Sequence, residues 1–193
     1  MSYDDVIHRL ALERQLVPPA TPVDKNAVRD GIRRRGDGDF DWQWVQATVY
    51  GSLIDEASLH EGVAAFFRVA RAAGVRVYVV SHKTEVASVD PHGVNLRVAA
   101  LGWMERHGFF APDGLGLARE DVYFEPTRAA KIARVAALGC THFIDDLEET
   151  FRETDFPDNV EKILFAPHGR PMSLPGVRVV RSWREITGYL FGE

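Results

Sequence analysis

The stretch Thr141-His-Phe-Ile-Asp-Asp-Leu-Glu-Glu-Thr150 shows most directly what kind of fold to expect. A short apolar run ends at two adjacent carboxylates, Asp145 and Asp146, and an acidic, helix-like segment follows. In α/β proteins, a buried strand that delivers paired carboxylates to its carboxyl end can hold a divalent cation near a phosphate. An acidic N-cap after an ordinary strand explains the pair equally well. The rest of the sequence has to separate these two interpretations.

The composition describes a globular protein of one domain, or of one domain with an insertion. The chain has 193 residues, 46% of them hydrophobic, and a net charge of -5, which is typical of a soluble protein. The absence of a broad basic field argues against nucleic acid as a partner. No signal peptide or membrane span is visible, so we expect no membrane partner and a cytoplasmic location. The lone Cys140 is expected to be a buried structural thiol.

The order of apolar runs predicts a helical segment followed by an α/β body. Residues 1–60 read as entirely helical, with helices over 3–16, 24–35 and 41–57. From residue 61 onward, short β-branched or apolar runs alternate with helical segments, which predicts a parallel sheet with right-handed crossovers. The expected strands cover 75–82, 121–125, 142–146, 162–166 and 177–183. The domains are therefore a helical region over 1–60 and an α/β core over 61–193.

Two further residues lie at edges where α/β proteins bind ligands. Ser81 ends the run Val75-Arg-Val-Tyr-Val-Val-Ser81, and a hydroxyl at the carboxyl end of a strand is well placed to hold a phosphate oxygen. A polar residue in an ordinary strand-to-loop turn is the alternative. Lys131 lies early in a helix, where a cation is unfavourable toward the helix dipole. Contact with a phosphate or an aspartate would explain it, although most helical lysines are merely solvated.

The order strand–Ser81, helix–Lys131, strand–Asp145–Asp146 resembles motifs II, III and IV of the haloacid-dehalogenase-like (HAD) superfamily of phosphohydrolases. The resemblance covers about residues 60–166. It implies a three-layer, Rossmann-like parallel sheet with an α-helical cap on the N-terminal side. It also implies that Ser81 binds the transferred phosphoryl group, that Lys131 neutralises charge, and that Asp145 with Asp146 holds Mg²⁺.

Motif I of that family, a strand ending in Asp-x-Asp with the nucleophile, has no match here. Asp4 and Asp5 follow no apolar run. Because that strand is central in the family's sheet, its loss would leave buried backbone groups unpaired, at about 1–3 kcal/mol each. A domain's whole stability is about 5–15 kcal/mol. We interpret the gap as a start codon assigned too late, which would remove about ten to twenty residues, the length of a strand and its approach.

Other constellations are weaker. His82, Lys83 and His92 lie in or near the loop after Ser81 and are candidates for substrate contact. Ser81 lacks a Gly-x-Ser-x-Gly elbow, which argues against a Ser-His-Asp hydrolase. No glycine-rich phosphate loop follows any expected strand, which argues against a nucleotide-binding Rossmann domain.

The sequence therefore predicts a HAD-like, Mg²⁺-dependent phosphatase that acts on a small phosphorylated metabolite. The 193-residue chain itself is expected to be catalytically incompetent, because its nucleophilic aspartate is missing. The alternative is a non-catalytic, degenerate HAD-like protein that binds a phosphorylated ligand or a protein partner. Nothing in the sequence indicates the substrate's identity or the oligomeric state.

Overall fold

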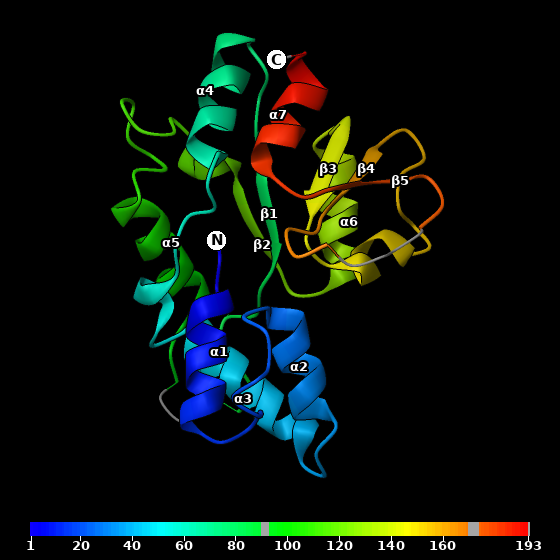
Figure 1. Ribbon diagram of the computed structural model, residues 1–193. Helices are drawn as coiled ribbons and strands as arrows, with labels where there is room; N and C mark the ends of the chain where they lie inside the picture. Colours follow the sequence, from blue (N-terminus) through cyan, green and yellow to red (C-terminus); the bar gives the residue numbers. More distant parts are fainter. Residues whose placement is uncertain (90–92, 170–173, 193) are drawn as a thin grey trace. The chain divides into compact units, whose positions relative to one another are not determined.

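The computed structural model describes residues 1–89, 93–169 and 174–192. These residues form a mixed α/β protein with seven α-helices and short parallel strands (Figure 1). The chain divides into two compact units. Unit 1 contains residues 1–60 and 84–107, and unit 2 contains residues 61–83 and 108–193.

Unit 1 is helical. Its elements are α1 (Asp4–Glu13), α2 (Lys25–Arg33), α3 (Gly38–Tyr50), a 3-10 turn η1 (Ile54–Glu56) and α5 (Leu96–Arg106). The helix predicted over 24–35 is confirmed as α2, and Asp24 caps it, since its side chain accepts a hydrogen bond from the Asn26 backbone N–H at 2.9 Å. Apolar side chains of α1, α2 and α3 meet in one core that includes the fully buried Ile7, Ile32 and Val45.

Helix α5 joins this unit through a buried tryptophan. Trp103 is 0% exposed, and its indole N–H donates a hydrogen bond of 3.0 Å to the backbone carbonyl of Ala57. The His107 ring stacks on it with a centroid separation of 3.8 Å. The second segment of unit 1 is therefore held against the first by both packing and a directed hydrogen bond.

Unit 2 alternates helices with parallel strands, as the sequence predicts. Its elements are α4 (Val63–Ala72), β1 (Val79–His82), η2 (Arg119–Asp121), β2 (Val122–Glu125), α6 (Arg128–Ala137), β3 (His142–Asp145), η3 (Glu148–Arg152), β4 (Glu161–Phe165), β5 (Val177–Val180) and α7 (Trp183–Phe191). β1 pairs with β2, with Val79 opposite Val122. β4 lies between β3 and β5, with Ile144 opposite Ile163 and Ile163 opposite Arg178.

Helices pack against the strands through alternating residues of β4. Leu164 is 1% exposed and lies in a core with Ile132 and Val135 of α6. The next residue, Phe165, contacts Trp183 of α7 instead, with ring centroids 5.9 Å apart. Successive side chains of a strand point to opposite faces, so α6 and α7 cover opposite faces of the three-stranded sheet.

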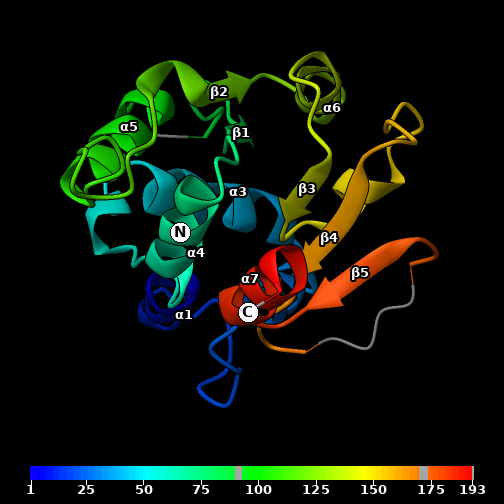
Figure 2. The same cartoon turned by 90° about the horizontal axis from the view of Figure 1, so that it is seen from above.

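The structure corrects two sequence predictions. The expected single sheet is two sheets, β1–β2 and β3–β4–β5, because β1 and β3 are not paired (Figure 2). The strand expected over 75–82 begins only at Val79. Residues before Val79 have no strand beside them, since η2 precedes β2, and Arg76 instead forms a bidentate ion pair with Asp121 at 2.7 and 3.2 Å.

The separation of a helical region over 1–60 from an α/β core over 61–193 as functional domains stays a prediction. By its contacts, the segment 84–107 belongs to unit 1. Among the described residues, no helix is both long enough and apolar enough to cross a membrane.

Candidate functional site

The candidate site lies at the carboxyl ends of β1 and β3 in unit 2. Ser81 and His82 are the last two residues of β1, and Asp145 is the last residue of β3. Helix α6 begins beside them, capped by Thr127, whose hydroxyl accepts a hydrogen bond from the Ala130 N–H at 3.0 Å. In parallel α/β structures this edge collects ligand-binding groups from different strands.

Lys131 reaches Asp145. The ammonium of Lys131 forms a hydrogen-bonded ion pair with Asp145 Oδ2, and both side chains are nearly buried, at 11% and 5% exposure. Lys131 Nζ also lies 5.2 Å from the centroid of the Phe143 ring. Lys131 is therefore not a solvated lysine on the helix surface, because its charge is directed into the protein. The sequence interpretation of Lys131 as an amine that reaches an aspartate is confirmed in its geometry.

Asp145 accepts a second hydrogen bond. Its Oδ1 receives the Leu147 N–H at 2.9 Å, which holds the turn that leads into η3. Burial raises the pKa of Asp145, the Lys131 ammonium opposes this shift, and the neighbouring Asp146 carboxylate raises the pKa further. This contact agrees in part with the interpretation of the acidic pair as a cap, because Asp145 stabilises the turn just before η3 and also pairs with Lys131.

His82 lies within the same charged environment. Its Nε2 is 3.1 Å from the carbonyl of Pro126, so the end of β1 is tied to the end of β2. Loss of water around the ring lowers the pKa of His82, the Pro126 carbonyl opposes this, and the positive charges of Lys131 and Arg128 lower it further. His82 therefore lies beside the two cationic side chains of Arg128 and Lys131 at the start of α6, which favour its neutral form.

We expect protonation of His82 to destabilise the fold. Because its pKa is lower in the folded chain than the ordinary 6.5, the unfolded chain binds the proton first as the pH falls. The His82 contribution is therefore fully present above about pH 6.5 and is lost as the pH falls through the folded-state pKa. Urea unfolding at about pH 7.5 and pH 5.5 should show a smaller pH dependence for His82→Gln than for the unchanged chain. Equal dependence in both would contradict this assignment.

The remaining predicted residues are less closely connected. Ser81 is half-buried and lies opposite Phe124 of β2. In the described part of the chain, Ser81 and Lys131 share no hydrogen bond. The Lys83 backbone N–H donates to the Glu125 carbonyl at 2.9 Å, which continues the β1–β2 ladder. His92 lies outside the described residues.

Arg128 was not among the residues singled out from the sequence. It is the first residue of α6 and its guanidinium pairs with Glu153 at 2.7 Å. The signal was available, because Arg128 follows the capping Thr127 directly and a cation in the first turn of a helix is unfavourable toward the dipole. The same reasoning identified Lys131 three residues later.

The donors at this edge fit a magnesium ion in their chemistry but supply only part of a site. Mg²⁺ prefers carboxylate oxygens and commonly binds one or two of them together with waters and substrate phosphates. Both oxygens of Asp145 already accept hydrogen bonds, whereas Asp146 is exposed. Among the described residues, neither carboxylate belongs to a group of three potential metal ligands.

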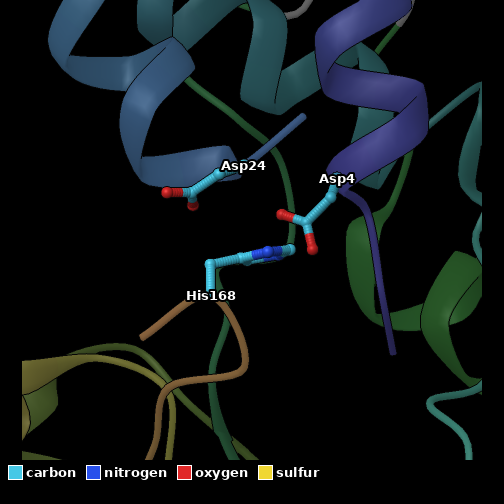
Figure 3. Close-up of side chains that lie close together, drawn as sticks. All are labelled: Asp4, Asp24 and His168. Carbon is cyan, nitrogen blue, oxygen red and sulfur yellow. The ribbon is translucent and has the colours of Figure 1, made fainter. Parts of the chain in front are cut away.

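A second set of side chains, Asp4, Asp24 and His168, is drawn in Figure 3. Asp4 accepts the Lys25 N–H at 2.8 Å, and Asp24 accepts the Asn26 N–H at 2.9 Å. Both carboxylates therefore stabilise the start of α2 in unit 1. His168 belongs to unit 2, and we do not treat the three residues as a metal site.

Comparison of the chain with models of protein families, with curated proteins and with solved structures finds no match in any of the three.

Proposed function

We propose that this chain supplies most of a HAD-like phosphohydrolase, a Mg²⁺-dependent phosphatase of a small phosphorylated metabolite. The observation that carries the proposal is the buried pair of Lys131 with Asp145 at the carboxyl end of β3, with His82, the residue after Ser81, within reach of the Lys131 charge. A buried ion pair is weak evidence for stability alone, because desolvation offsets much of the attraction. Its position at a ligand-binding edge favours a functional reason.

In the proposed fold, the parallel strands of unit 2, in their two sheets, form the middle layer of a Rossmann-like three-layer arrangement with helices on both sides. Helices α6 and α7 on opposite faces of β4 support this arrangement. The helical unit 1, which contains α1, α2 and α3, would correspond to the helical cap that the resemblance implies.

The proposed roles follow the chemistry of each side chain. The Ser81 hydroxyl donates to a phosphate oxygen, and Lys131 balances negative charge on the carboxylate and the phosphate. Asp146, with Asp145 behind it, holds Mg²⁺, which when bound would neutralise charge on the phosphate oxygens. The attacking carboxylate has no candidate among the described residues at this edge, since Asp145 is engaged by Lys131 and Leu147.

Turnover of para-nitrophenyl phosphate with Mg²⁺ tests the proposal. We expect no turnover from the 193-residue chain, and measurable turnover from an extended protein, which is the same chain carrying an engineered strand that ends in Asp-x-Asp ahead of Met1. In the extended protein, Ser81→Ala and Asp146→Asn should each lower kcat/KM by about 10²–10³, the usual effect of removing one preorganised group. Arg178→Gln, at the start of the β5 strand away from this edge, is the matched control and should leave kcat/KM unchanged.

Activity that persists in both site variants would contradict the assigned roles. An extended, folded protein without turnover would favour the second candidate, a non-catalytic protein that binds a phosphorylated ligand. Both Asp145 oxygens already accept hydrogen bonds, which supports that candidate. Asp145 is then not free to attack a phosphate, whereas Ser81 and Lys131 could still bind one. Calorimetric titration with para-nitrophenyl phosphate would separate binding without turnover from the absence of a site.

A further inference from the structure

Helix α6 of unit 2 carries two ion pairs that differ in burial. Lys131 pairs with Asp145, and the two side chains are 11% and 5% exposed. Arg128 pairs with Glu153 at 2.7 Å, and these two side chains are 44% and 25% exposed. The first pair is therefore held inside the protein, whereas the second lies where water and dissolved molecules reach it.

Both pairs join α6 to the segment that follows β3. Asp145 is the last residue of β3, and Glu153 is the residue directly after η3. Residues three positions apart on a helix lie on the same side of it, with their Cβ atoms about 5–6 Å apart. Arg128 and Lys131 are therefore neighbours on the side of α6 that meets this segment, and Arg128 is the more exposed of the two.

The charge of Arg128 also acts at the end of β1. The positive charges of Lys131 and Arg128 both lower the pKa of His82, which is the last residue of β1. Ser81, the residue proposed above to bind phosphate, comes directly before His82. Arg128 is therefore a second cation in the surroundings of the proposed phosphate site.

The pair with Glu153 holds Arg128 only weakly. An exposed ion pair adds little to stability, because water screens both charges and two long side chains lose conformational freedom. A cation in the first turn of a helix is also unfavourable toward the helix dipole. Another anion can therefore replace Glu153 on the guanidinium at a small cost in stability.

The guanidinium of Arg128 has the donors for a particular kind of ligand group. Its planar set of N–H donors binds carboxylate or phosphate oxygens through two parallel hydrogen bonds. Arg128 already donates from Nε to a carboxylate oxygen of Glu153. A ligand carboxylate or phosphate would therefore make the same kind of contact that the protein makes with itself.

We propose that Arg128 selects ligands that carry a second anionic group, a carboxylate or a second phosphate, in addition to the phosphate bound near Ser81 and Lys131. The second group replaces Glu153 on the guanidinium, while the buried pair of Lys131 with Asp145 stays in place. A phosphate ester of an uncharged alcohol lacks this contact and binds more weakly. The inference rests on the proposed phosphate site and narrows its substrate class.

Calorimetric titration of the 193-residue chain with three phosphonates tests the proposal. Phosphonopropionate, ethylene diphosphonate and propylphosphonate share a phosphonate on the same short carbon chain. The first ends in a carboxylate, the second in another phosphonate and the third in a methyl group. We expect at least one of the two ligands with a second anionic group to bind about tenfold more tightly than propylphosphonate. The order of the two identifies the preferred anionic group.

Three variants assign this preference to Arg128. Arg128→Met should remove it and leave the Kd for propylphosphonate unchanged. Glu153→Gln removes the competing carboxylate and should tighten binding of the preferred ligand severalfold, a result that a purely structural role of the pair does not produce. Arg178→Met is the matched control, since Arg178 also pairs with an exposed glutamate, Glu161, and it should retain the full preference.

The possible failures are distinguishable. Equal binding of all three phosphonates would overturn the role of Arg128 and leave the phosphate site in place. Binding of none of them would overturn both this proposal and the phosphate site on which it rests. A preference that persists in Arg128→Met would also overturn the proposal, because a different cation would then bind the second anionic group.

Discussion

Replacing Lys131 with methionine is expected to destabilise the protein by about 3–5 kcal/mol, the usual effect of removing one partner from a buried ion pair. Asp145 is 5% exposed at its side chain. Because burial raises its pKa and Lys131 opposes this shift, the carboxyl without the ammonium must either stay charged and unpaired or take up a proton, and both cost stability. Methionine retains about the length and the apolar stem of lysine, so the loss of stability reports the removal of the charge and not of the packing. Urea unfolding at neutral pH measures the free energy of unfolding.

Two matched variants make this result specific. Arg128→Met removes another cation from the same helix, but its pair with Glu153 is exposed, so the expected loss is about 0–1 kcal/mol. In the double variant Lys131→Met with Asp145→Asn, no uncompensated charge remains, and most of the stability should return. A loss below about 1 kcal/mol for Lys131→Met alone would mean that water reaches Asp145 and that the pair is not a buried one.

Replacing Trp103 with alanine is expected to cost about 3–5 kcal/mol of stability, as for other large buried aromatic side chains. The indole is fully buried and holds α5 to the segment that contains Ala57. The expected result is a lower midpoint in urea unfolding followed by circular dichroism.

Trp103→Phe separates packing from the hydrogen bond, because it keeps an aromatic ring and leaves the Ala57 carbonyl without its donor. Its expected cost is smaller, about 1–3 kcal/mol. Val98→Ala changes an exposed residue of the same helix, at 65% exposure, and should stay within about 0.5 kcal/mol of the unchanged chain. A Trp103→Ala loss no larger than that of Val98→Ala would contradict the assignment of Trp103 to the core of unit 1.

Much of unit 2 could be predicted from short-range signals. The run at Lys162-Ile-Leu-Phe165 predicts a buried strand and becomes the central strand β4. The apolar residues Ile132 and Val135 predict a helix with one buried face, and α6 has it. These predictions succeed because periodicity depends on residues only a few positions apart.

The edges of the sheet could not be predicted in the same way. The run over 75–82 predicts one long strand, but only Val79–His82 is strand, because pairing depends on β2, about forty residues later in the sequence. Lys131 had two sequence interpretations: a solvated lysine on the helix surface, or an amine that contacts a phosphate or an aspartate. Only the packing of α6 beside β3 decided between them.

The sequence by itself determined the order of helices and strands and the parallel direction of the strands. It also determined that the carboxylates of Asp145 and Asp146 lie at the end of a strand. Each follows from local composition and from the chain's alternation between strand and helix. The tertiary structure alone decided that β1 and β3 are not paired with each other and that the charge of Lys131 is buried against Asp145. Both are set by contacts between residues distant in the sequence, where the backbone groups and charges of one segment depend on what another segment places beside them.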